Sequence, residues 1–294
     1  MRQEAYFCTV KELDELGKNN IPRQLISHTH LIYSSPATLA FNSPGAEGFG
    51  VKRAGLAVPD SVMLIVSPGC CGRNTSVLSS MRAYQDRFYY LLMDETDIVT
   101  GRHLKKIPKA VAEICEGLKK KPSVVMICIT CVDALLGTDM ERVCHKAEEY
   151  AGVPVRPCYM YALTREGRKP PMVHVRQSVY SLLEPKKKKG NVVNLLGYFS
   201  PLTDDCELYD LLHGAGVKTI HEISRCKDYA QYQTMSEANF NLVLHPEARF
   251  AAEDFHDRLK IPYIELRRLY QIDKIASQYR ALAAALGVEF EDEI

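Results

Sequence analysis

Long apolar runs and an excess of one charge are both missing from this chain of 294 residues. No apolar stretch approaches the ~18 residues that a membrane-spanning helix requires, so we expect no membrane association. The 37 basic and 36 acidic side chains leave a formal net charge of +1. Such a balance gives no global attraction to nucleic acid, so nucleic acid is not expected as a partner.

Several short motifs are missing as well. The N-terminal segment 1–7 lacks the basic-then-apolar pattern of a secretory signal peptide, so we expect a cytoplasmic protein. The chain has no GxxxxGK(S/T) loop, so it is not expected to hydrolyse ATP itself. The step Gly214-Ala215-Gly216 follows a predicted helix and lacks the third glycine of a dinucleotide fingerprint.

The composition is that of a soluble globular protein, with 46% hydrophobic and 25% charged residues. A chain of this length predicts about two domains. Its ten cysteines are the unusual feature. In a reducing cytoplasm they indicate core residues, metal ligands or redox groups rather than a disulfide framework.

Short apolar runs alternate with helix-like segments in both halves of the chain. In the first half we expect strands at 62–66, 124–129 and 153–155 and helices at 75–87, 105–120 and 132–150. In the second half we expect strands at 191–196, 217–220, 240–244 and 261–266 and helices at 204–213, 247–260 and 272–286. Alternation of this kind predicts mostly parallel sheets flanked by helices.

The predicted fold class is therefore α/β, with two Rossmann-like domains at 1–187 and 190–294. The segment between them, Glu184 to Gly190, contains four consecutive lysines and is interpreted as a solvated linker. His174 and Arg176, which precede it, are expected to be surface residues of the inter-domain segment.

Cysteines follow two of the predicted strands, at the edge where open α/β sheets bind ligands. Cys70 and Cys71 follow the first strand, and Cys128 and Cys131 flank the end of the next one. If these strands are neighbours, four thiols converge, and their number and softness suit zinc or an iron–sulfur cluster. Two alternatives remain open: cysteines that only fill the core, and a redox-active dithiol formed by Cys128 and Cys131.

Four stretches of the sequence resemble the nitrogenase component 1 family, which includes nitrogenase subunits, their cofactor-assembly relatives and the light-independent protochlorophyllide reductases. These stretches are Ser43–Gly48, Pro68–Gly72, Thr130–Asp139 and Val192–Gly197. The resemblance implies that Cys71 and Cys131 are cluster cysteines. It also implies a fold of Rossmann-like domains, of which the third usual one is expected to be absent from this chain.

Two departures from the family pattern affect the expected site. No cysteine occurs at 40–43, where the family usually has one, and Thr138 replaces the first aspartate of a Gly-Asp-Asp step. Each chain then offers only Cys71 and Cys131, so two paired chains would supply the four thiolates of a 4Fe–4S cluster. The pair would be a homodimer or a heterodimer with a homologous subunit. The alternative is a site within one chain, formed by Cys70, Cys71, Cys128 and Cys131.

The resemblance implies a subunit of an iron–sulfur reductase that receives low-potential electrons from a separate ATP-dependent iron protein, with an unidentified substrate. A second hypothesis is a non-enzymatic scaffold for cluster or cofactor assembly, and a third is a CxxC thiol redox or zinc protein. In nitrogenase's catalytic subunit a cofactor ligand follows a second-domain strand, where this chain has His245. His245 is either a metal ligand or a histidine held by the backbone at a strand end.

Overall fold

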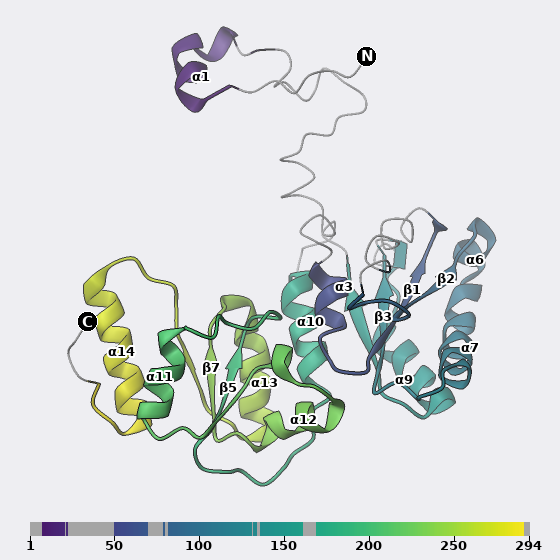
Figure 1. Cartoon of the computed structure of the whole chain (residues 1–294). Helices are drawn as coiled ribbons and strands as arrows, with labels where there is room; N and C mark the ends of the chain where they lie inside the picture. The colour runs from purple at the N-terminus through teal and green to yellow at the C-terminus, as the bar shows by residue number, and fades with distance from the viewer. Residues whose placement is uncertain are drawn as a thin grey trace.

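The computed structural model describes residues 8–20, 22, 50–69, 79, 82–130, 132–133, 136–160 and 169–290. Within these residues the chain forms two four-stranded sheets, in which every pair of neighbouring strands is parallel (Figure 1). None of the described helices has both the length and the apolar character needed to cross a membrane. The predicted α/β class with parallel sheets flanked by helices is confirmed.

The first sheet has the strand order β2-β1-β3-β4. Its strands are β1 (Val62–Ser67), β2 (Phe88–Leu92), β3 (Val125–Ile129) and β4 (Val155–Tyr159). Every residue of β1 and β3 is buried, which explains why both strands are continuous apolar runs rather than alternating patterns. These two strands pair in register from Val62 with Val125 to Val66 with Ile129.

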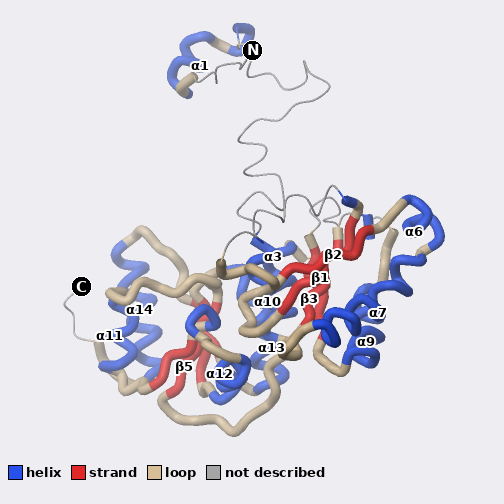
Figure 2. The backbone as a smooth tube through the Cα atoms, turned by 45° about the vertical axis from the view of Figure 1, so that its right-hand side comes forward, coloured by secondary structure: helices blue, strands red, loops and turns tan. Residues whose placement is uncertain are grey.

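Helices cover both faces of this sheet (Figure 2). One face packs against α7 (Arg102–Gly117) and α9 (Met140–Ala151), and the other packs against α3 (Gly50–Gly55) and α10 (Pro171–Tyr180). Helix α9 begins where Asp139 accepts a hydrogen bond from the main chain of Arg142, and it ends at Gly152 in a left-handed conformation.

The second sheet repeats this order as β6-β5-β7-β8. Its strands are β5 (Val192–Leu196), β6 (Thr219–His221), β7 (Phe240–Val243) and β8 (Tyr263–Glu265). One face packs against α11 (Glu207–Gly214) and α14 (Ile272–Leu286), and the other packs against α12 (Tyr229–Gln233) and α13 (Arg249–Leu259).

The remaining elements are short. They are α1 (Val10–Leu16), α6 (Glu95–Thr100) and the 3-10 turns η1 (Lys18–Asn20), η4 (Ile223–Arg225), η5 (Thr234–Glu237) and η6 (Pro246–Ala248). Helix α6 begins with a capping box between Asp94 and Asp97.

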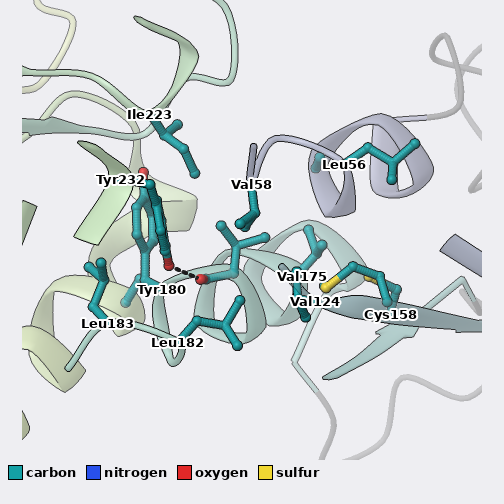
Figure 3. Close-up of a cluster of buried hydrophobic side chains, with 14 of the residues drawn as sticks. Leu56, Val58, Val124, Cys158, Val175, Tyr180, Leu182, Leu183, Ile223 and Tyr232 are labelled. Atoms are coloured by element: carbon teal, nitrogen blue, oxygen red, sulfur yellow. Dashed lines mark hydrogen bonds between the residues drawn. The ribbon is translucent and has the colours of Figure 1, made fainter. Parts of the chain in front are cut away.

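One continuous apolar core joins the two sheets through α10. Val175 and Val179 of this helix lie in a single buried cluster that includes side chains from both sheets. Figure 3 shows Tyr232 of the second half donating a hydrogen bond to the main-chain oxygen of Val179. Arg258 of α13 donates to the main-chain oxygens of Tyr180 and Leu183 at the end of the same helix.

Several sequence-based expectations need correction. Residues 82–86 form a turn rather than the end of the helix predicted at 75–87, whose residues 75–78, 80 and 81 lie outside the described part. The edge strand β2 and helix α10 were not expected. Val132 and Asp133 are helical, as predicted, but the chain turns at 136–137, and α9 begins only at Met140. Arg176 is not a surface residue, because α10 buries its guanidinium against the second sheet. The boundary between residues 187 and 190 stays a prediction.

We expect Asn194→Ala to destabilise the fold. The amide nitrogen of Asn194 donates to the main-chain oxygen of Met235 at 2.9 Å and to Oδ1 of Asn241 at 2.7 Å, inside the second sheet. Removing this donor leaves the buried Oδ1 of Asn241 unpaired and removes one of the two hydrogen bonds to the main-chain oxygen of Met235, so the free energy of unfolding should fall by about 2 kcal/mol. Chemical denaturation measures the loss, and the exposed Asn239→Ala is the control. Equal stability of the two variants would contradict the expectation.

Candidate functional site

The candidate site lies at the carboxyl edge of the first sheet, where β1 and β3 end. The chain passes from β1 to β2 on one side and later returns to β3 on the other side of β1. Such a switch point leaves a crevice between the two strand ends, which is the usual ligand position in open α/β sheets. Cys70 directly follows Gly69, and Cys131 directly follows Thr130. Cys70, Cys71 and Cys131 themselves lie outside the described residues.

Two residues with buried hydroxyl groups lie at this edge of the sheet. Ser67 is the last residue of β1, and Thr130 follows β3. Extending the register that pairs Val66 with Ile129 by one residue sets Ser67 opposite Thr130. Because side chains alternate along a strand, both residues belong to the face covered by α3 and α10.

Neither hydroxyl has a hydrogen-bond partner among the described residues. Ser67 is 0% and Thr130 is 3% exposed, and neither Ser67 Oγ nor Thr130 Oγ1 is paired within the described structure. A buried hydroxyl without a partner costs about 1–3 kcal/mol, so two of them side by side point to a site that binds a further group. Helix α3, on the same face, carries the buried Lys52.

This arrangement fits the sulfur-ligated metal group that the sequence predicts. Cysteine thiolates follow both strand ends in the sequence, and the two hydroxyls can donate hydrogen bonds to metal-bound sulfur. The described residues alone contain no group of three or more His, Cys, Asp or Glu side chains placed to bind a metal.

A buried polar network supports the segment that follows Cys131. Nε2 of His103, at the start of α7, lies 2.9 Å from Oδ1 of Asp133, and Thr138 Oγ1 donates to the same oxygen at 3.0 Å. His103 and Asp133 are at most 1% exposed. The other ring nitrogen of His103 donates to the main-chain oxygen of Asp97 at 3.0 Å. Thr138, which departs from the family pattern, is therefore part of a network that holds this segment against α7.

Asp97 extends the network to the surface. Its carboxylate accepts from Lys106 at 2.7 Å and from Arg102 at 3.2 Å. The hydrogen bond from Lys106 is the main cause that lowers the pKa of Asp97. The network thus joins α6, α7 and the turn after β3.

Cys128 does not lie at the edge of the sheet. It is fully buried within β3, two residues before Thr130, and its register partner on β4 is Cys158. Burial raises the pKa of Cys158 well above its usual value. Cys158 packs in the apolar core with Cys128 (Figure 3 shows Cys158 among its neighbours), and this favours a packing role for Cys128 over a ligand role.

The second sheet has an equivalent switch point between β5 and β7. Gly197 follows β5 with φ 134°, and a Cβ there would lie 2.7 Å from the main-chain nitrogen of His245. Arg176 donates to the main-chain oxygen of Gly197 and, at 2.8 Å, to Glu247. His245 caps the turn η6 by accepting from the main chain of Glu247, and burial lowers its pKa. This contact agrees with the expectation of a histidine held by the backbone.

His174 lines a cavity of about 330 Å³ on α10, together with Tyr159 and Lys169. Its ring meets that of Tyr159 edge to face at 4.2 Å, and burial lowers the pKa of His174 to about 4. His174 is therefore neutral at physiological pH and half-buried, not the surface residue expected from the sequence.

Sequence reasoning missed Ser67, Thr130 and the partner of Asp133. A serine or threonine next to a cysteine motif carries no special pattern, since its significance depends on which strand lies beside it. His103 lies 30 residues before Asp133, so only the packing of α7 on the sheet brings them together.

We expect His103→Ala to destabilise the protein strongly. The substitution removes two hydrogen bonds from a fully buried network, leaves Thr138 as the other partner of Asp133, and opens a cavity, so the free energy of unfolding should fall by about 3 kcal/mol. His145→Ala is the matched control, because His145 forms only an exposed pair with Glu149, and it should change stability by less than about 0.5 kcal/mol. Denaturant titration measures both, and a His103→Ala loss no larger than the control's would refute the role of the network.

Comparison with known proteins finds relatives among nitrogenase-related proteins. The family described as nitrogenase component 1 type oxidoreductase matches residues 47–294. The chain is similar to the nitrogenase iron-molybdenum cofactor biosynthesis protein NifE of Nostoc sp., at 27% identity over 78% of this chain and 49% of that protein. The NifE of Klebsiella pneumoniae is also 27% identical, over 83% of this chain and 58% of its own length. The chain spans about half the length of the curated relatives it matches.

Solved structures show the same fold. A structure of nitrogenase Cp1 at pH 6.5 superposes with a TM-score of 0.61, at 18% identity, over 83% of this chain and 58% of that one. Because the family match extends over most of the sequence and includes both strand ends of the candidate site, the chain belongs to the nitrogenase component 1 type oxidoreductase family.

Proposed function

We propose that this chain is a cluster-binding subunit of a nitrogenase-like reductase, with Cys71 and Cys131 as ligands of a 4Fe–4S cluster. One observation carries the proposal: β1 and β3 pair at the switch point, and each strand end combines an unpartnered buried hydroxyl with a cysteine that follows in the sequence. Four thiolates are the usual ligand number for such a cluster, so a second chain is needed to complete the set.

Exposed apolar side chains support a partner at this edge. Leu92 ends β2 and is 60% exposed, Leu136 follows β3 and is 51% exposed, and Val99 on α6 is 85% exposed. Leu92 pairs with Ser67 in the register of β1 with β2, and Val99 and Leu136 belong to the segments that follow β2 and β3. Large exposed apolar side chains gathered at one edge are typical of an interaction surface. The partner is a second copy or a homologous subunit.

The bound cluster would store and release single electrons at low potential. The residues of this chain would anchor it, exclude water and set the polarity around it. Asp133, His103 and Thr138 hold the segment after Cys131, and the core between α3 and α10 covers the inner side of the sheet. A separate ATP-dependent iron protein is the proposed electron donor.

A second candidate function is the assembly of a metal cofactor. The NifE relatives carry this role in their names, and this chain spans about half of their length. In that case 1–187 and 190–294 would form the two Rossmann-like domains of a scaffold that passes its cluster on. The CxxC redox or zinc hypothesis is less well supported, because Cys128 is fully buried in the core.

The first experiment is anaerobic purification with iron and sulfide counted per chain. A cluster shared by two chains should give about two irons per chain. Cys71→Ala and Cys131→Ala should each abolish iron binding, whereas Cys206→Ala in the second half is the control and should not. Four irons per chain that also depend on Cys70 and Cys128 would move the site inside one chain. No iron, or zinc alone, would contradict the cluster proposal.

The reductase and assembly roles predict different fates for a bound cluster. In a reductase the iron stays on the chain through cycles of reduction and oxidation. In an assembly protein the iron moves to an iron-free acceptor protein, which can be followed by the loss of iron from the donor after chromatographic separation. Retention of all iron in the presence of iron-free acceptors would rule out the assembly role.

A further inference from the structure

We infer that Ser67 and Thr130 donate hydrogen bonds to the sulfur atoms of the metal group at the candidate site and thereby raise its reduction potential. The inference rests on the proposed cluster and adds two hydrogen-bond donors to it. The cysteine motifs of the sequence do not assign a role to either side chain.

Burial and register carry the argument. Of the seven buried side-chain polar atoms that lack a partner among the described residues, three lie at this edge: Ser67 Oγ, Thr130 Oγ1 and Asp133 Oδ2. Ser67 and Thr130 lie opposite each other on adjacent strands and on one face of the sheet. Thr130 immediately precedes Cys131, and Ser67 lies three residues before Cys70.

Two other buried serine hydroxyls of the same half are paired, whereas the buried hydroxyl of Tyr180 is not. Ser61 Oγ accepts a hydrogen bond from Arg87 at 2.7 Å, and Ser178 Oγ donates to the main-chain oxygen of Pro157 at 2.8 Å. Ser67 and Thr130 have no such partner among the described residues, and both precede cysteines in the sequence.

The direction in which the reduction potential shifts follows from the chemistry of the donors. A hydroxyl carries one proton to donate, whereas thiolate and sulfide sulfur can only accept. A hydrogen bond to sulfur is stronger when the group carries more negative charge, so it stabilises the reduced form more than the oxidised form. Two such donors should make the group easier to reduce.

The test compares Ser67→Ala, Thr130→Val and the double variant with the wild type, all purified anaerobically with their iron. We expect unchanged iron content and a midpoint potential shifted to more negative values, further in the double variant than in either single one. Thr130→Ser keeps the hydroxyl and should restore the wild-type potential. Ser178→Ala is the matched control, since it removes a hydroxyl with a protein partner and should lower the melting temperature without shifting the potential.

A second measurement uses the same variants without iron. Because the two hydroxyls have no partner in the part of the chain that the structure describes, their removal should leave the melting temperature unchanged or higher. A lower melting temperature in Thr130→Val would overturn the inference, as would iron-loaded variants that all keep the wild-type potential. If the wild type binds no iron at all, the cluster proposal itself fails, and the inference fails with it.

Discussion

The parallel pairing of β1 with β3 is the constraint on which the candidate site depends. Residues far apart in the sequence reach the same edge because these strands run in the same direction and in register. A shift of one residue in this register would turn Ser67 and Thr130 away from each other. Complete burial of both strands resists such a shift, because it would disrupt the apolar contacts on both faces of the sheet.

Helix α10 connects the two sheets through hydrogen bonds and apolar contacts as well as along the chain. Ser178 binds the main chain of β4, whereas Arg176, two residues earlier, binds the main chain after β5. The apolar core continues from one sheet to the other around this helix. Both sheets are therefore anchored to the same ten-residue helix, the first at the middle of β4 and the second at the end of β5.

Thr138, one of the two departures from the family pattern, has a structural role. Thr138, which replaces a family aspartate, donates to Asp133, and Asp133 in turn meets His103. A buried carboxylate with two partners holds the turn after β3 without the missing aspartate. The packing of α7 on the first sheet brings His103 into this network.

Much of the fold could be predicted from the sequence. The apolar runs at 62–66 and 124–129 predicted buried parallel strands, and the motifs at 68–72 and 130–139 predicted the family. The edge strand β2 could not be predicted, because its half-exposed pattern carries a weak signal. Helix α10 was missed because its residues are buried between two sheets, which gives it little amphipathic character.

The sequence by itself determined the family, the α/β class and the cysteines that follow two strand ends. Only the tertiary structure decided which polar side chains meet at that edge. Cys128 lies two residues before Thr130, on the same face of the sheet but inside β3, where it packs in the core. His103 meets Asp133 because α7 packs on the face of the sheet. Patterns along the chain report the period of each element, whereas contacts between elements depend on strand order and register, which no local pattern encodes.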